Sequence, residues 1–367
     1  MARSMFADAD AEDHHLVALL AGRGPKGASG RERPHSAALT RRLLADWQVL
    51  PSLSDDVADD RLRAVLTPED HARLRNARLG VAAFQRAQVA GSAGLLEAFD
   101  VHGVPYSLLK GAAAACLLYP ERHMRGAWDI DIGVAWDDIG TAEALALSSG
   151  YHQAQRDPDR PFFRRADREL RAIVEESHFE LGFLVRRLEV TNLSDAVRAA
   201  LRDEPWLHQF WHDAGSVSPW CYSVVDIHHK VSLDIELRGL LAATQRVVRA
   251  EASLSVPDLA WFGAHLIFKL YWESVHKYGK GLYQFADVVR LAPLLDDRIF
   301  ARLVVILENH KLLAAGYHVL KHVPDFGVAL PPHVANFIAD MRSPPLDTDP
   351  IETNDLGDMW PKLWGRR

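Results

Sequence analysis

Apolar residues recur along much of the chain at the three- and four-residue spacing that places one stripe along a helix. The clearest stretch covers residues 68–99, where Glu69 and Asp70 favour a helix start and the Gly-Val-Pro turn at 103–105 ends the segment. This pattern predicts one or two long amphipathic helices. The same spacing returns after Pro257 and predicts three further helices, over 259–275, 283–295 and 301–320.

The middle of the chain has a different pattern, in which apolar and polar residues alternate with the two-residue period of β-strands. A short apolar run enters a Lys-Gly turn and a helix of small residues, and the segment Trp-Asp-Ile-Asp-Ile-Gly-Val follows. A further amphipathic helix is expected over 137–149. The expected strand segments are 106–109, 128–134, 179–183 and 222–231.

Composition divides the chain into four parts. Residues 1–67 contain a segment rich in Gly, Pro and Arg, 23–35, which has too few apolar residues to pack, so we expect this region to be partly disordered. The strands and the helices before them predict a core domain over 68–240. The returning helical spacing predicts a helical domain over 241–342, and the proline-containing acidic tail at 343–367 is expected to be loosely ordered.

Bulk composition favours a globular protein, since 48% of the 367 residues are hydrophobic. The formal net charge of -7 argues against a long nucleic acid or an anionic membrane as partner. No secretory signal precedes Asp13 and no apolar run reaches membrane-spanning length. Cys116 and Cys221 do not form a pair with metal-ligand spacing, which fits a reducing compartment. We therefore expect a cytoplasmic protein.

Paired acidic residues carry the most informative chemistry. Asp129 and Asp131 are two residues apart on an expected strand, so both carboxylates point to the same side. Oxygen ligands of this kind suit Mg²⁺ or Mn²⁺. Two such ions can activate an attacking hydroxyl and stabilise a departing pyrophosphate, a mechanism that needs a third carboxylate. Asp226 is the preferred third acid, and Glu180 and Asp234 are the alternatives.

The neighbouring residues have phosphate-binding chemistry. Gly111 opens a helix whose free backbone N–H groups can bind triphosphate oxygens at close range. Arg125 has the rigid guanidinium fork that suits phosphate, whereas Lys110 either adds a point charge or forms an ion pair within the fold. His228 shares the strand face of Asp226, where it orients that carboxylate, contacts substrate or is structural. A Walker A pattern and a Gly-x-Gly-x-x-Gly pattern are both absent, which argues against P-loop NTPases and Rossmann dehydrogenases.

In this order the motifs resemble the uncharacterised nucleotidyltransferase family of bacteria, a branch of the polymerase β-like superfamily. The resemblance covers roughly residues 82–295 and places His265 and Asp287 where that family has a histidine helix and an Asp-bearing helix. The superfamily glycine is commonly followed by serine, whereas Ala112 follows Gly111 here and supplies no hydroxyl ligand. The matching motifs are Leu109-Lys110-Gly111, Arg125, Asp129-Ile130-Asp131, Gly150-Tyr151 and Asp226-Ile227-His228.

The resemblance implies an α/β (α+β) fold with a polymerase β-like core, a mixed sheet, N-terminal helices and a C-terminal helical region. It also implies two divalent ions, Mg²⁺ or Mn²⁺, held by Asp129, Asp131 and Asp226. The implied reaction moves a nucleoside monophosphate, with AMP the first expectation, from a nucleoside triphosphate to a hydroxyl or phosphate on a small molecule or peptide. A protein-adenylylating enzyme of antitoxin-like or regulatory type, and a non-catalytic nucleotide-binding scaffold, are the alternatives.

Overall fold

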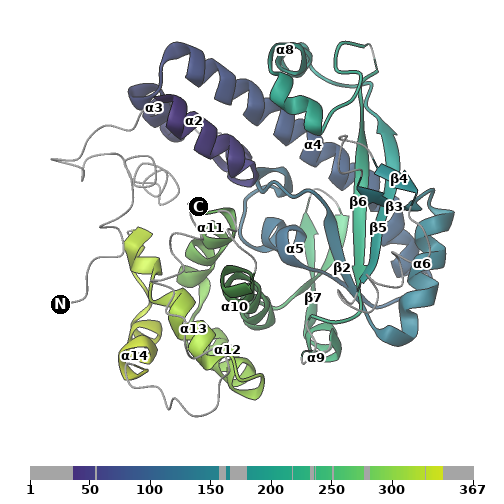
Figure 1. Cartoon of the computed structure of the whole chain (residues 1–367). Helices are drawn as coiled ribbons and strands as arrows, with labels where there is room; N and C mark the ends of the chain where they lie inside the picture. The colour runs from purple at the N-terminus through teal and green to yellow at the C-terminus, as the bar shows by residue number, and fades with distance from the viewer. Residues whose placement is uncertain are drawn as a thin grey trace. The chain divides into compact units, whose positions relative to one another are not determined.

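The computed structural model describes residues 36–53, 56–156, 163–165, 180–216, 218–231, 235, 237–249, 252–276, 282–326 and 328–341. The chain forms two compact units (Figure 1). One is the continuous segment 75–258, and the other combines 1–74 with 259–367. The expected loop at 23–35 and the expected loose tail at 343–367 both lie outside the described residues.

A mixed sheet forms the centre of the unit 75–258 (Figure 1). Its six strands are ordered β1-β2-β6-β5-β3-β4. The pair β2–β6 is parallel, and the other pairs are antiparallel. Every residue of β2 is buried, which fits a strand that has neighbours on both edges. The strands are β1 (Tyr106–Leu108), β2 (Ile130–Val134), β3 (His152–Arg156), β4 (Phe163–Arg165), β5 (Glu180–Glu189) and β6 (Trp220–His228).

The long helix α4 (Pro68–Val101) anchors this sheet, and it is one helix where the sequence allowed one or two. The side-chain amide of Gln88 donates to the carbonyl of Trp128 at 2.8 Å and accepts from the backbone N–H of Val224 at 3.0 Å. Gln85, one turn earlier, donates to the carbonyl of Ala127 at 2.6 Å. Helix α4 therefore fixes the backbone that leads into β2.

Shorter elements complete the unit. Helix α5 packs against β2, and α9 packs against β1 and β2. Ser194 caps α8 by accepting a hydrogen bond from the backbone N–H of Val197, as an N-cap serine does. These elements are α5 (Lys110–Leu117), η3 (Arg122–Met124), η4 (Trp136–Asp138), α6 (Ile139–Ser148), α8 (Asp195–Asp203), η5 (Pro205–Gln209) and α9 (Leu237–Ala242).

The region expected to be helical from residue 241 begins instead with a hairpin, β7 (Thr244–Arg249) and β8 (Ala252–Pro257). Along β8 the buried Leu254 and Val256 alternate with serines, which is a strand period that helical spacing does not explain. Strand β8 packs against β1, so the compact unit ends at 258/259 rather than at the expected 240/241. Its beginning at 74/75 lies inside α4 rather than at the expected 67/68.

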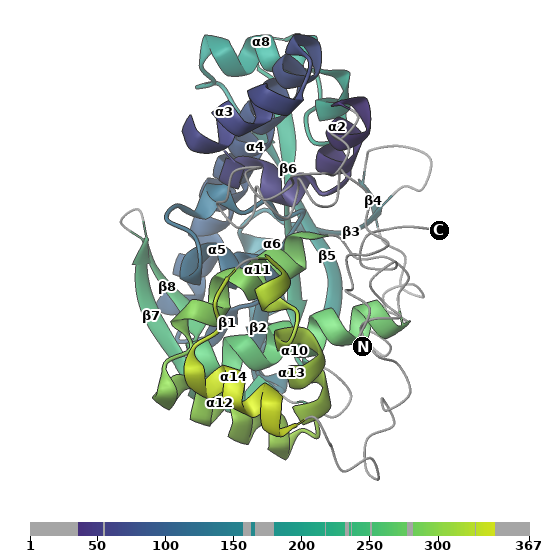
Figure 2. The ribbon, with the colours of Figure 1, turned by 90° about the vertical axis from the view of Figure 1, so that its left-hand side faces the viewer.

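The other unit is helical in its described parts. Helix α10 packs against α11, α12 and α13, and this group includes α14 (Figure 2). The single helix expected over 301–320 is in fact two, because Lys311 adopts a left-handed backbone with φ of 57° and the N–H of Leu312 returns to the carbonyl of Leu307. The elements are α2 (Ser36–Ala45), η2 (Trp47–Leu53), α3 (Asp56–Val65), α10 (Leu259–His276), α11 (Leu282–Leu291), η6 (Ala292–Leu294), α12 (Asp297–Asn309), α13 (Leu313–Leu320), η7 (Val323–Phe326) and α14 (Pro332–Asp340).

Candidate metal and nucleotide site

Two acidic side chains meet at the parallel strand pair. Asp131 on β2 lies directly opposite Asp226 on β6 in the strand register. Side chains at paired positions of neighbouring strands point to the same face of the sheet. Both side chains are buried, with relative exposures of 4% and 3%. The alternation that suggested neighbouring strands for these two residues therefore brings their carboxylates together.

His228 joins the two carboxylates from the end of β6. Its Nε2 atom lies 2.9 Å from Oδ1 of Asp131 and 3.4 Å from Oδ2 of Asp226. Asp131, Asp226 and His228 each offer one ligand atom, and these atoms all lie within 4.8 Å of one another. Glu180, the register partner of His228 on β5, places its Oε2 atom 3.4 Å from Nδ1 of the same ring. Glu180, which was an alternative third carboxylate, thus lies beside the preferred one.

Lys110 brings a positive charge into this cluster from the start of α5. Its ammonium nitrogen lies 2.5 Å from Oδ1 of Asp131 and 3.1 Å from Nε2 of His228. Lys110 has a left-handed backbone with φ of 42°, a conformation that few residues other than glycine adopt. The ion pair within the fold, one of the two expectations for Lys110, is present. We call Lys110, Asp131, Glu180, Asp226 and His228 the acidic cluster.

The charges of the acidic cluster shift one another's pKa. Burial alone would lower the pKa of Lys110, but the nearby carboxylates, with Asp131 foremost, outweigh it and raise that pKa. Burial would likewise raise the pKa of Asp131, yet Lys110 and His228 hold it well below its usual range. Burial, followed by the charge of Glu180, raises the pKa of Asp226 well above its usual range. Negative charge is therefore crowded beyond what one lysine compensates.

The donor atoms of the acidic cluster fit a divalent cation. Oδ1 of Asp226 is buried and has no hydrogen-bond partner within the described part of the chain. A buried carboxylate oxygen of that kind needs a cation or a donor. Burial, and next the charge of Lys110, lower the pKa of His228, so its imidazole is neutral and can serve as a ligand. Carboxylates suit Mg²⁺ and Mn²⁺, whereas an imidazole ligand is more typical of Zn²⁺ and other transition metals.

Asp129 is near the charges of the acidic cluster and also lines a neighbouring pocket. It precedes β2 by one residue and is outside the three-residue ligand group of the described chain. Asp129 lines a small pocket together with Gly111 and Arg125. Burial, and next the charge of Asp131, raise the pKa of Asp129 to about 7, and the charges of Lys110 and Glu180 also act on this carboxyl group. Its role as a metal ligand stays a prediction.

The two residues expected to bind phosphate are adjacent in this pocket. The guanidinium nitrogens of Arg125 lie 3.9 Å from the point where a Cβ atom on Gly111 would stand. Arg125 is only 4% exposed, and its Nη1 donates to the carbonyl of Gly126. Arg122, which the sequence did not single out, lines the same pocket. Helix α5 starts at Lys110, no side chain caps its first N–H groups, and Gly111 and Ala112 of its first turn line the pocket.

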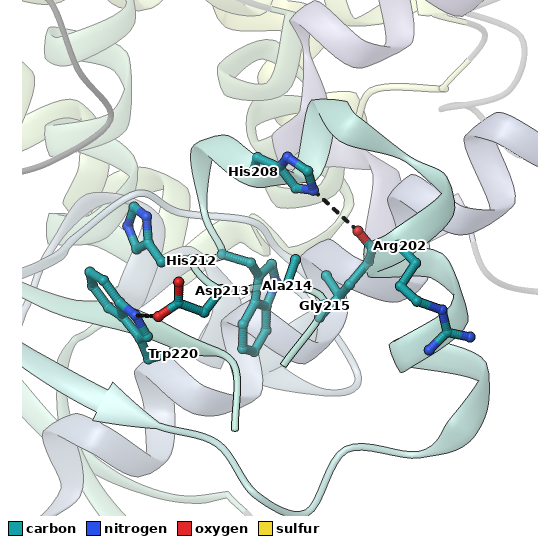
Figure 3. Close-up of a pocket in the computed structure, with 9 residues that line it drawn as sticks. Arg202, His208, His212, Asp213, Ala214, Gly215 and Trp220 are labelled. Carbon is teal, nitrogen blue, oxygen red and sulfur yellow. Dashed lines mark hydrogen bonds between the residues drawn. The ribbon is translucent and has the colours of Figure 1, made fainter. Parts of the chain in front are cut away.

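A second pocket lies at the opposite end of β6 (Figure 3). Its volume is about 530 Å³, and it is lined by residues that include Trp211, His212 and Trp220. Nε1 of Trp220 donates to Asp213 at 2.7 Å, and the rings of His212 and Trp220 are 4.0 Å apart between centroids. Trp220 starts β6 whereas Asp226 is near its end, which separates this pocket from the acidic cluster by about 20 Å.

The comparison with known families agrees with this geometry. A family model described as "Uncharacterised nucleotidyltransferase" matches residues 38–326. The chain belongs to this family. The mixed sheet with its surrounding helices is consistent with a nucleotidyltransferase fold, and family membership makes the chain a transferase that acts on a nucleoside triphosphate. No curated protein matches the sequence.

The match of the nucleotidyltransferase family spans the acidic cluster and the pocket of Arg125. Nucleotidyltransferases generally use divalent metals, in agreement with the ligand group of Asp131, Asp226 and His228. His265 and Asp287, expected from the resemblance, lie on α10 and α11 of the other compact unit. Across the described residues, no helix is long and apolar enough to cross a membrane.

Sequence reasoning did not place two members of the acidic cluster. It named Lys110 without fixing its partner and ranked Glu180 behind Asp226 as a separate alternative. Glu180 lies in an alternating segment, Phe-Glu-Leu-Gly-Phe. This alternation was the signal that Glu180 could share a sheet face with Asp226. Asp234, the remaining alternative, lies outside the described residues.

Proposed function

We propose that this nucleotidyltransferase is a metal-dependent enzyme that moves a nucleoside monophosphate, AMP first, to a hydroxyl or phosphate of a small molecule or peptide. The observation that carries the proposal is the register pair Asp131–Asp226 with its buried, unpartnered carboxylate oxygen. A net charge of -7 supports a small acceptor rather than a polynucleotide.

Asp131 and Asp226 are the residues that would hold a divalent ion, Mg²⁺ or Mn²⁺, with His228 as a third ligand. Asp129 would contribute to a second ion on the side of the pocket that it shares with Gly111. When bound, such ions would polarise the acceptor oxygen and neutralise charge that develops on the triphosphate.

The protein's own groups would position the substrates. Arg125 and the first N–H groups of α5 would bind the triphosphate, and Gly111 keeps the backbone free of a side chain beside the guanidinium of Arg125. Ala112 supplies no hydroxyl, so the outer phosphates would depend more on the arginines. Asp226, which would face the acceptor oxygen at the metal, would help to take up the proton of the acceptor.

A direct test is release of pyrophosphate from each of the four nucleoside triphosphates, with Mg²⁺ or Mn²⁺ and a fractionated cell extract as source of acceptor. Asp131→Asn and Asp226→Asn should each lower the rate by about 10³-fold or more, because an amide cannot replace a carboxylate as metal ligand. The exposed Asp137→Asn is the matched control and should retain the full rate. Mass spectrometry of the products then identifies the acceptor.

Equal rates for Asp131→Asn and the wild-type protein would contradict the proposed chemistry. A nucleotide adduct that appears only on polypeptides would replace the small-molecule acceptor with a protein. Nucleotide binding without pyrophosphate release in any fraction would favour a binding scaffold.

A further inference from the structure

Lys110 occupies a position that a metal-ligand cluster does not ordinarily give to a lysine. Its ammonium contacts Asp131 and His228, which are two of the three residues of the ligand group. The backbone that carries it is held in the left-handed region with φ of 42°. Such a conformation persists in a non-glycine residue only when the surroundings fix it, and it clusters at functional sites. The contact is therefore a built feature of the site.

The ammonium and a divalent cation compete for the same atoms. Nε2 of His228 lies 3.1 Å from the ammonium of Lys110 and 2.9 Å from Oδ1 of Asp131, so a metal that binds this nitrogen or that oxygen would take the place of the ammonium. Oδ1 of Asp131 lies 2.5 Å from the ammonium nitrogen, and a metal bound to that oxygen would place a second positive charge within a few ångströms of the first. Like charges at such a distance repel strongly in a buried site.

The side chain of Lys110 can also move out of the acidic cluster. Its side chain is 25% exposed, whereas that of Asp131 is 5% exposed. The flexible four-carbon stem of a lysine can swing while the strand that carries the carboxylate stays fixed. Gly111 is the next residue along the chain, and the guanidinium of Arg125 stands beside it. A triphosphate bound there would offer the ammonium new anionic partners.

We propose that Lys110 is an internal counter-ion of the metal site, which holds Asp131 and His228 until a divalent cation binds and then moves to the triphosphate. This inference rests on the proposed function of the site. Its consequence is that metal and nucleotide bind cooperatively, because the nucleotide draws away the charge that competes with the metal. Metal alone binds weakly, and the ion pair protects the crowded carboxylates before substrate arrives.

The test measures Mn²⁺ affinity of the full chain by electron paramagnetic resonance, with and without a non-hydrolysable ATP analogue. Lys110→Met keeps the length of the side chain and removes its charge. This variant should bind Mn²⁺ alone about tenfold tighter than the wild-type protein or better, because the competing ammonium is gone. The analogue should tighten Mn²⁺ binding in the wild-type protein by a similar factor and in Lys110→Met by much less.

Lys311→Met is the matched control, since Lys311 is an exposed lysine with the same left-handed backbone, φ of 57°. It should bind Mn²⁺ as the wild-type protein does. Lys110→Arg, which retains a positive charge, should bind Mn²⁺ alone no tighter than the wild-type protein. Equal or weaker Mn²⁺ affinity of folded Lys110→Met would overturn the proposal.

The remaining outcomes of the Mn²⁺ titrations also decide between the proposals. If Lys110→Met is unfolded, Mn²⁺ should restore its circular dichroism spectrum, because the metal replaces the missing charge, and failure of Mn²⁺ to do so would overturn the proposal. Asp226→Asn should abolish Mn²⁺ binding both in the wild-type protein and in Lys110→Met. If none of the proteins binds Mn²⁺ with or without the analogue, the metal-dependent function itself fails, whereas tight binding that Lys110→Met does not improve refutes only the counter-ion.

Discussion

Two chemically identical side chains of the acidic cluster acquire opposite properties from their neighbours. Lys110 contacts Asp131 and, with His228, holds its pKa low against the effect of burial. Burial and Glu180 raise the pKa of Asp226. The pKa values of the two acids are thus shifted in opposite directions, a separation typical of sites that handle protons. The difference arises because Lys110 reaches Asp131 from α5, whereas Glu180 lies on β5, the strand that pairs with β6.

At the same scale, Arg125 offers a test of nucleotide binding that is independent of the metal. Arg125→Lys keeps the charge but removes the bidentate fork. We expect affinity for nucleoside triphosphate to fall about 10- to 100-fold, the loss expected from one charge-assisted hydrogen bond, while Mn²⁺ affinity without nucleotide is unchanged. Isothermal titration calorimetry measures both. Unchanged nucleotide affinity would remove Arg125 from the phosphate-binding group.

Sequence reasoning reached the acids of the site because they follow the two-residue period of strands. That period placed Asp131 and Asp226 on facing positions, and the register agrees. Asp129 precedes β2 by one residue and has no register partner on β6, so its place in the site stays a prediction. The contact of Lys110 with Asp131 is made from a left-handed backbone, and the contact of Glu180 with His228 follows a register irregularity between Glu180 and Phe183. An alternation of apolar and polar residues predicts neither feature.

At the scale of elements, α4 acts as the frame for the parallel strand pair. One side chain, Gln88, satisfies the carbonyl of Trp128 and the N–H of Val224, so it ties the approach to β2 to the middle of β6. Gln88 is 1% exposed, and water does not reach the two backbone groups easily. The spacing of Asp131 from Asp226 therefore depends on a helix that contributes no residue to the acidic cluster.

We expect Gln88→Ala to lower the free energy of unfolding by about 2–4 kcal/mol, because two buried backbone groups lose their partners. Gln209→Ala, which removes a local hydrogen bond to the carbonyl of Trp206, is the control and should cost less than about 1 kcal/mol. Urea denaturation followed by circular dichroism gives both values. A Gln88→Ala protein as stable as the control would show that water replaces the amide.

The elements that the sequence missed are those where helical and strand periods compete. The hairpin β7–β8 stands in a stretch that separates two helices, and its serines at alternate positions were the strand signal. At the break between α12 and α13, Lys311 has a left-handed backbone. A glycine or asparagine at this position would have predicted a helix end. Such a lysine carries no comparable sequence signature.

For the whole molecule, the pocket at the start of β6 predicts a dependence of stability on pH. Burial, opposed by Asp213 and assisted by Arg187, lowers the pKa of His212 to about 4. The unfolded chain, with a histidine pKa near 6.5, binds more protons between pH 4 and 6.5 than the folded chain does. Stability from His212 is therefore complete above about pH 6.5 and is lost as the pH falls toward 4.

His212→Phe keeps an aromatic ring against Trp220 and removes the titrating group. The free energy of unfolding of the wild-type protein should decline by up to about 3 kcal/mol more than that of the variant between pH 7 and 4. Urea titrations across this range measure the difference. Parallel curves for the two proteins would mean that His212 takes up its proton at the same pH in the folded and the unfolded chain, and would contradict the lowered pKa.

The parallel pairing of β2 with β6 also determines when, during synthesis of the chain, the acidic cluster can form. Asp131 and His228 are 97 residues apart in the chain, and the strands, turns and helices between them must be made before the pair can meet. Closing so long a loop is slow compared with forming local helices. A ribosome that has released β2 but not β6 therefore carries a chain in which Asp131 has neither Asp226 nor His228 beside it.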